Sequence, residues 1–282
     1  MLSEQQIDFF KENGYLRIPK VFTPAEIRQM SEELDRLIQE WAITNMGWTG
    51  PWRQVYMDPD TEKKSQLTHL HDLHFYSQAW CRAVANPRLA EAMAELLGTP
   101  NVELHHTTLH LKPPETGMPF PMHQDSPFYR HEGFGYIDAL VHVDDATLEN
   151  GCLRFLPGSH TQGHLDHVLT MPDGSPCSPH LPTDRYRLAD TVACPAEAGD
   201  VVAFSIYTVH GSEINRTDRW RRLVRIGYRD PLNRQVAGQS LGRAGLLVHG
   251  TRPLGSLQPT ASGNLAEVYA GQPEREAAAA SA

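Results

Sequence analysis

A histidine and an aspartate two positions apart are the residues best suited to chemistry in this sequence. His123 and Asp125 lie in segment 119–130, which is too rich in proline and aromatic residues to be helical. In an extended chain, positions i and i+2 point to the same side, so these two side chains can converge on one point. A second histidine from far along the chain would complete a facial triad, which is typical of non-haem Fe(II) oxygenases.

The distal histidine is predicted to be His210. A turn at 199–200 is followed by β-branched and aromatic residues, which predict a buried strand that ends near His210. The chain turns again at 215–218, and a returning strand is expected to form a hairpin and place Arg221 at the same end of a barrel. A guanidinium there is suited to binding a carboxylate through two hydrogen bonds. Such a set of residues favours an oxygenase that uses 2-oxoglutarate.

At these positions the chain resembles the phytanoyl-CoA dioxygenase family. The likeness is carried by His123 and Asp125, by segment 150–160, by His210 with Arg221, and by the opening residues 2–16; it spans roughly residues 1–235. The resemblance implies that the two histidines and Asp125 bind Fe(II), and that 2-oxoglutarate chelates the iron with its distal carboxylate on Arg221. It further implies that O2 is consumed, that succinate and CO2 are released, and that an unactivated C–H of a small molecule is hydroxylated. The substrate is expected to be a natural product, an amino-acid-like compound or an acyl compound.

The resemblance also suggests further contacts to the co-substrate. Thr108 and Leu140 lie on predicted strands, and Ser212 would add a hydroxyl group near Arg221. Thr108 is equally compatible with a purely structural place in the sheet. Gln124 corresponds to a glutamine that the family uses near the co-substrate, although strict alternation would point it away from the metal.

A substrate pocket is predicted from loop residues near the ligands. The candidates are Trp52, His74, Phe75, Phe128, Tyr129 and Arg130. Segment 68–74, with three histidines, is the main rival metal motif, but it has no matching distal ligand and is better explained as a pocket wall. His142 and His160 are interpreted as structural residues.

The elements predict a mainly β protein with flanking α-helices, built on a double-stranded β-helix of the jelly-roll or cupin-like type. We expect a single dioxygenase domain over 1–270. Its parts are a helical layer at about 1–98, a core at about 99–235 and a C-terminal extension at about 236–270. Residues 271–282 are expected to form a disordered tail.

Composition narrows the function further. The net charge is −9 over 282 residues, which argues against broad contact with nucleic acid or an anionic membrane. The four cysteines show no C-x-x-C spacing, no apolar run approaches a membrane span, and the N-terminus lacks a signal peptide, so a cytoplasmic location is expected. Related non-haem halogenases carry a small residue in place of the carboxylate ligand, so the resemblance together with Asp125 disfavours halogenation. Desaturation, ring closure and epimerisation remain open as other outcomes of the same chemistry. Two alternatives from other classes also remain: a non-redox cupin-like isomerase or hydrolase, and a non-catalytic small-molecule-binding barrel.

Overall fold

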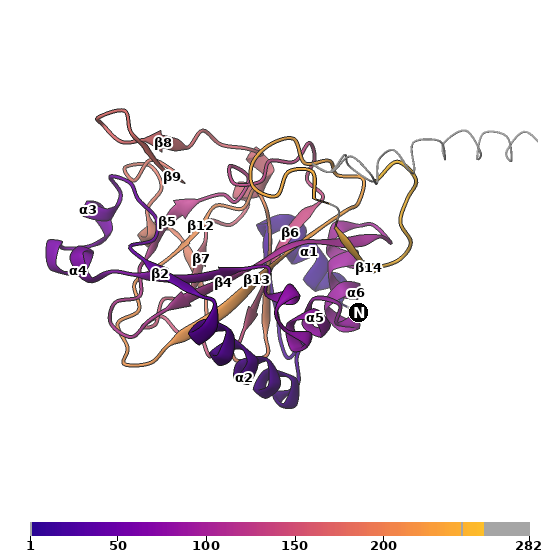
Figure 1. Cartoon of the computed structure of the whole chain (residues 1–282). Coiled ribbons are helices and arrows are strands. Elements are labelled where there is room, and N and C mark those ends of the chain that lie inside the picture. The colour runs from indigo at the N-terminus through magenta and orange to yellow at the C-terminus, as the bar shows by residue number, and fades with distance from the viewer. Residues whose placement is uncertain (1, 244, 257–282) are drawn as a thin grey trace, which may run out of the picture.

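An eight-stranded antiparallel sheet, here called the major sheet, is the largest element of the computed structural model, which describes residues 2–243 and 245–256 (Figure 1). Its strands follow the order β1-β11-β6-β13-β4-β3-β2, and β14 also pairs with β4. The bounds are β1 Tyr15–Ile18, β2 Ile43–Asn45, β3 Leu67–His71, β4 Val102–Lys112, β6 Tyr136–His142, β11 Val201–Ser205, β13 Arg221–Arg229 and β14 Leu246–His249.

A four-stranded minor sheet faces it. Its order is β10-β7-β12-β5, with β5 at Phe120–His123, β7 at Leu153–Phe155, β10 at Val192–Cys194 and β12 at His210–Ser212. A separate pair, β8 Val168–Thr170 and β9 Pro176–His180, lies in the insertion that follows β7. Apolar side chains from both sheets, including Leu140, Phe155, Phe204 and Leu223, form one buried cluster between them. The two packed sheets confirm the predicted double-stranded β-helix.

Helices α1 Glu4–Asn13, α2 Pro24–Glu40, α5 Gln78–Val84 and α6 Pro87–Leu97 cover the outer face of the major sheet, away from β5, β7 and β12 (Figure 1). The short helices α3 Arg53–Tyr56 and α4 Pro59–Lys64 lie apart from them, and Tyr56 of α3 packs beside β5. The 3-10 turns are η1 Leu73–Phe75, η2 Ser159–Gln162 and η3 Leu188–Asp190. Ser3 and Thr23 begin α1 and α2 with capping boxes, as their sequences predict. The apolar stripe of α2, at Met30, Leu34 and Leu37, packs in the same core as α5, α6 and the sheet.

Alternation along β13 separates this outer core from the interior of the barrel. Val224 and Ile226 belong to the core beneath the helices, whereas Leu223 belongs to the core between the sheets. Because side chains alternate along a strand, Arg221 and Arg225 lie on the same face as Leu223. One strand therefore carries two arginines into the interior, where they are only 2% and 7% exposed.

The predicted hairpins are wrong, although the strands themselves are present. β6 pairs with β11 and β13, whereas β7 pairs with β10 and β12, so the turn near 150–151 connects two sheets. In the same way, the run that ends at His210 is divided into β11 in the major sheet and β12 in the minor sheet. β12 and β13 are likewise not partners. In a jelly roll the chain passes from one sheet to the other, so sequential neighbours are often not paired neighbours.

The predicted helical layer at about 1–98 differs from the structure, because it contains strands as well as helices. The first 98 residues form helices, but they also supply β1, β2 and β3 to the major sheet. In the C-terminal extension, β14 packs on β4, and residues 257–282, including the predicted tail, lie outside the described residues. No helix in the described part of the chain is long and apolar enough to cross a membrane.

Candidate metal centre

Strand pairing in the minor sheet brings the two predicted histidine ligands together. His123 ends β5 and His210 begins β12, and the two are direct cross-strand partners with ring centroids 4.2 Å apart. Each Nδ1 faces a backbone carbonyl two residues earlier, that of Pro121 at 2.8 Å and that of Thr208 at 2.9 Å. A carbonyl can only accept, so Nδ1 carries the hydrogen and each Nε2 keeps its lone pair for a metal. Burial lowers the pKa of His210 to about 3, which keeps its ring neutral.

Asp125 completes the cluster from the turn that follows β5. Its backbone N–H donates to the carbonyl of Ile206, which fixes the turn against the end of β11. Its Oδ1 lies 3.5 Å from His123 Nε2, and one ligand atom from each of the three residues lies within 4.8 Å of the others. Two neutral imidazoles and one carboxylate are a donor set that suits a divalent iron ion. The residues present therefore fit the metal that the sequence predicts.

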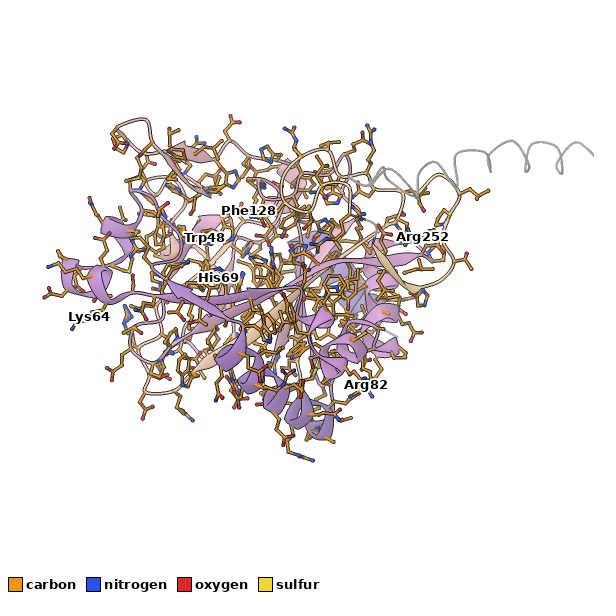
Figure 2. All side chains as sticks on the ribbon, viewed as in Figure 1. Trp48, Lys64, His69, Arg82, Phe128 and Arg252 are labelled. Atoms are coloured by element: carbon orange, nitrogen blue, oxygen red, sulfur yellow. The ribbon has the colours of Figure 1, made fainter. Side chains whose placement is uncertain are left out.

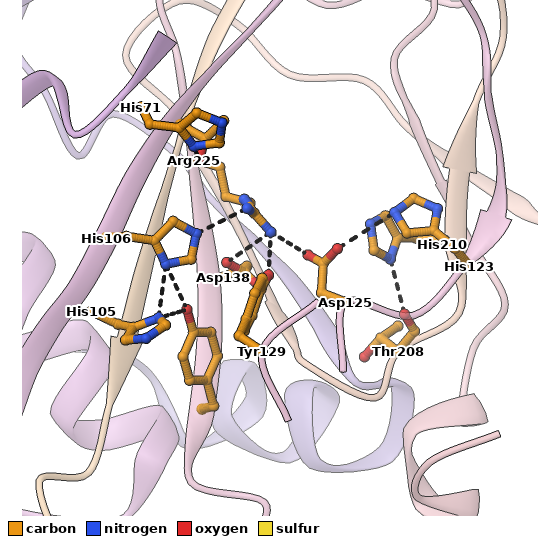
Figure 3. A network of polar contacts seen from close by, with 12 residues as sticks. His71, His105, His106, His123, Asp125, Tyr129, Asp138, Thr208, His210 and Arg225 are labelled. Atoms are coloured by element: carbon orange, nitrogen blue, oxygen red, sulfur yellow. Dashed lines mark hydrogen bonds and ion pairs between the residues drawn. The ribbon is translucent and has the colours of Figure 1, made fainter. Parts of the chain in front are cut away.

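Arg225 holds the other oxygen of this carboxylate (Figure 3). Its Nη1 donates to Asp125 Oδ2 at 3.0 Å and to the hydroxyl of Tyr129, and that hydroxyl donates to Asp138 Oδ2 at 2.8 Å. Burial alone would raise the pKa of Asp125, but the guanidinium and the neighbouring imidazoles hold it well below its usual range. Asp125 is therefore ionised, with one oxygen occupied by Arg225 and the other directed to the metal cluster.

A directional chain of hydrogen bonds leads away from Arg225. Its Nη2 can only donate, so His106 Nε2 accepts at 2.9 Å, and His106 Nδ1 in turn donates to His105 Nδ1 at 2.8 Å. His105 Nε2 then donates to Gln235 Oε1 at 3.0 Å, and the amide of Gln235 donates to the carbonyl of Gln239. The chain thus connects the metal ligand to the segment after β13.

An inner cavity extends from the three ligands toward Arg221. It is lined by His110, Phe120, His123, Asp125, Leu140, Leu153, Phe204, His210, Gly211, Ser212, Arg221, Leu223 and Arg225. Arg221 is fully buried, and its Nε has no hydrogen-bond partner among the described residues. Burial lowers its pKa to about 10, so it remains a cation at neutral pH. Beside it, Lys112 Nζ donates to Ser212 Oγ at 2.8 Å and to the carbonyl of Glu213. A buried cation without an acidic contact fits the distal carboxylate of 2-oxoglutarate.

A second pocket, here called the outer pocket, adjoins the inner cavity. The two share His110, Asp125 and Arg225, and the outer pocket has a volume of ≈ 210 Å³. Its other walls include Trp48, His69, His71, Thr108 and Phe128, and Figure 2 shows Trp48, His69 and Phe128 in the same region of the molecule. Asn45, His71 and Gln239 are exposed, so the pocket opens to solvent on their side.

The predicted co-substrate residues divide between the two cavities. Leu140 and Ser212 line the inner cavity with Arg221. Thr108 lies in the outer pocket instead, where its hydroxyl is 3.3 Å from His71 Nδ1. Gln124 lines neither, because its amide nitrogen donates to the carbonyls of residues 163 and 207 and its oxygen accepts from the N–H of residue 165. Its orientation follows the strict alternation of the strand and points it away from the metal.

The predicted substrate residues are mostly placed elsewhere. Phe128 lines the outer pocket, and Tyr129 belongs to the Arg225 network behind the metal cluster. Trp52 is buried in a separate core with Met57 and Met118, and Arg130 is exposed. The remaining two, His74 and Phe75, lie in η1, where His74 contacts Thr107 and Phe75 is 72% exposed; neither lines the cavities described above. Segment 68–74 supplies two walls of the outer pocket, His69 and His71.

Several residues of the site were not predicted. Trp48, His110 and Arg225 line these cavities but are not among the residues that the sequence predicts. Arg225 had a usable signal, since a strand that directs Arg221 inward also directs the residue four positions later inward. Trp48 packs edge-on against the ring of His123, with centroids 4.7 Å apart, but it comes from an irregular loop and no periodic pattern marks it.

Comparison with known proteins agrees with this geometry. Residues 10–223 match the family model described as phytanoyl-CoA dioxygenase (PhyH). A probable alpha-ketoglutarate-dependent hypophosphite dioxygenase of Stutzerimonas stutzeri is 27% identical over 231 residues, which cover 81% of this chain and 78% of that protein. Phytanoyl-CoA dioxygenase domain-containing protein 1 of Mus musculus is 31% identical over 258 residues, which cover 78% and 88%.

The fold has solved relatives as well. The carbocyclase SnoK from nogalamycin biosynthesis superimposes with a TM-score of 0.67 at 21% identity, over 84% of this chain and 88% of that one. This likeness supports the jelly-roll assignment, while the family match supports the enzyme class. The chain therefore belongs to the phytanoyl-CoA dioxygenase family and is an Fe(II)- and 2-oxoglutarate-dependent dioxygenase that acts on a small molecule.

Proposed function

We propose that His123, Asp125 and His210 bind Fe(II) and that Arg221 binds the distal carboxylate of 2-oxoglutarate. The observation that carries the assignment is that the three ligands and a buried arginine without an acidic contact line the same small cavity, of ≈ 30 Å³. Ser212 adds a hydroxyl group beside the guanidinium, held by Lys112. We also propose that these residues act within one catalytic domain, whose core is segment 99–235.

The protein's own residues would orient and protect the reaction. Iron, when bound, would supply the oxidising chemistry, in which O2 and 2-oxoglutarate are consumed and succinate and CO2 are released. Leu140, Leu223 and Phe204 form apolar walls of the inner cavity, and these exclude water from the co-substrate. Trp48 and Phe128 pack against the ring of His123 and form an aromatic wall of the outer pocket.

We propose hydroxylation of a C–H bond in a small substrate that occupies the outer pocket. The volume of ≈ 210 Å³ is below the roughly 300–1,000 Å³ typical of sites for drug-sized ligands, so a compact substrate fits better than a whole acyl-CoA. The hypophosphite dioxygenase named above, whose substrate is small, is consistent with this reading. Asp125 occupies the position where a halide would otherwise bind, which is why hydroxylation is preferred over halogenation.

Anaerobic binding of Fe(II) and 2-oxoglutarate tests the assignment. Wild-type protein should develop the weak visible charge-transfer band of an iron-bound 2-oxoacid, and His210→Ala should abolish it. Arg221→Ala should raise the 2-oxoglutarate concentration needed for half-saturation by roughly 10- to 100-fold, because it removes hydrogen bonds between charged groups.

Arg222→Ala provides the matched control. Arg222 adjoins Arg221 in sequence but binds Asp144 and Asp35 on the outer side of the strand. Its loss should leave the 2-oxoglutarate affinity unchanged. No band in folded, iron-loaded wild type, or equal effects of the two arginine variants, would contradict the proposal.

A further inference from the structure

The outer pocket contains an organised set of hydrogen-bonding groups across three strands. Pairing of β3, β4 and β13 aligns His71, Thr108 and Arg225 in one cross-strand row. The adjacent row places His69 beside His110. All five residues line the outer pocket, so these neighbouring rows present imidazoles, a hydroxyl and a guanidinium to the same space.

Two of these groups are buried and lack hydrogen-bond partners in the described part of the chain. They are Nε of Arg225 and Nδ1 of His69. The Nε of an arginine can only donate, and a neutral imidazole can donate from one of its nitrogens. An unpaired buried donor costs free energy, so a ligand oxygen that accepts from it is favoured. Figure 3 shows the ring of His71 on one side of Arg225 and the carboxylate of Asp125 on the other.

Charge favours an anionic ligand, an argument that rests on the proposed function. When Fe(II) and dianionic 2-oxoglutarate are both bound, their charges cancel. Of the charged residues that line the two cavities, Asp125 is an anion and Arg221 and Arg225 are cations, which leaves one net positive charge on the cavity walls. Burial lowers the pKa of the three imidazoles in the outer pocket, which favours their neutral forms.

No acidic side chain other than Asp125 lines the outer pocket among the described residues. Asp72, next to His71 in sequence, is already paired with Arg243 at 2.7 Å. The opposite walls of the pocket are aromatic, from Trp48 and Phe128. A ligand with one oxyanion and a short apolar portion could therefore contact both the polar and the aromatic walls of the pocket.

We propose that the outer pocket selects a small substrate with a carboxylate or phosphonate group, which His69, His71 and Arg225 bind. The oxyanion occupies the polar rows on β3, β4 and β13. The short apolar portion lies against the packed rings of Trp48 and Phe128, beside the metal ligands. Substrate recognition in this chain is thus separate from recognition of 2-oxoglutarate, whose carboxylate belongs to Arg221 at the far end of the inner cavity.

Calorimetric titration of protein loaded with Ni(II), a redox-inactive metal, tests the proposal. Saturating 2-oxoglutarate first occupies Arg221, and ethylphosphonate, propionate or neutral propanamide is then added. At least one oxyanion should bind about tenfold or more tightly than propanamide, since only the oxyanion forms charge-assisted hydrogen bonds. Whichever of the two oxyanions binds more tightly identifies the preferred head group.

Isosteric variants connect the effect to the pocket. His69→Phe and His71→Phe keep a ring of similar size but remove its hydrogen bonds, and each should weaken oxyanion binding by about tenfold without changing 2-oxoglutarate affinity. His74→Phe, at a nearby histidine that does not line the pocket, should change neither. Propanamide binding as tightly as the oxyanions, or histidine variants without effect, would overturn the inference. Failure of 2-oxoglutarate itself to bind the Ni(II)-loaded wild type would instead contradict the proposed function.

Discussion

Arg225 determines how Asp125 is presented to the metal. A carboxylate has two oxygens, and Arg225 occupies Oδ2 while Oδ1 faces His123. The guanidinium itself is fixed by Tyr129 and by the imidazole of His106, so it cannot follow Asp125 if the carboxylate rotates. Packing around the arginine thus leaves Asp125 with one oxygen free for the proposed iron site.

Replacing Arg225 should therefore weaken metal binding, although Arg225 is not one of the proposed ligands. Arg225→Met is expected to lower Ni(II) affinity by roughly 10- to 100-fold, the usual effect of removing a group that orients a ligand. Arg225→Lys should restore part of it, since an ammonium group can still pair with Asp125. Calorimetric titration of chelator-treated protein with Ni(II) measures the affinity of each variant.

Arg229 is the matched control for this prediction. It is also buried and on β13, but it pairs with Glu103 at 2.6 Å, away from the metal cluster. Arg229→Met should destabilise the fold, because it leaves the buried Glu103 without one of its partners. It should not change metal affinity in protein that remains folded. Equal losses of affinity in the two methionine variants would show that Arg225 acts only through stability.

At the scale of elements, the end of α1 supports the segment that carries His210. Gly14 ends the helix with a φ of 82°, and its carbonyl accepts from the hydroxyl of Thr208 at 2.6 Å. The carbonyl of Thr208 in turn accepts from Nδ1 of His210. A helix in the N-terminal layer is thereby connected to the orientation of a metal ligand nearly 200 positions later.

Gly14→Ala should therefore affect both stability and metal binding. A Cβ at this position would collide with the ring of His160 and lie 2.7 Å from Thr208 Oγ1, in addition to the cost of a left-handed conformation. Gly98 ends α6 with a similar φ of 67° but has open space around it. Gly98→Ala should cost about 1–2 kcal/mol in urea unfolding, from conformation alone. Gly14→Ala should cost more and should also weaken Ni(II) binding; identical effects of the two variants would refute this coupling.

The elements also show what the sequence could and could not predict. Spacing predicted that His123 and Asp125 share one side of the chain, because period-two alternation is local and holds wherever the chain is extended. Their prediction as metal ligands also needed a distal histidine. His210 was identified from the strand pattern before it, even though that strand proved to be two strands in different sheets. Pairing across sheets is non-local, so turn signals such as that at 150–151 misled the hairpin assignment. The chain of hydrogen bonds from Arg225 includes a contact between His105 and Gln235. These residues lie 130 positions apart, and no sequence pattern reveals such a contact.

For the whole molecule, the buried histidines determine how stability responds to acid. Seven of the 15 histidines are buried. Burial lowers the pKa of His105 to about 2 and those of His131 and His142 to about 4, with nearby arginines adding to each effect. These rings stay neutral in the folded protein at pH values where an unfolded histidine, with its pKa near 6.5, takes up a proton.

The protein should accordingly lose stability as pH falls from about 6.5 toward 4, and show no contribution from these groups above that window. Below the unfolded pKa of about 6.5 the unfolded state binds more protons, and each such histidine removes up to about 1.4 kcal/mol per pH unit. His142→Leu removes one of these groups from β6. Its free energy of unfolding should therefore decline less steeply than that of the wild type between pH 6.5 and 5, whatever its stability at neutral pH. Urea unfolding of chelator-treated protein across this range measures both slopes, and parallel slopes would show that His142 is protonated in the folded state.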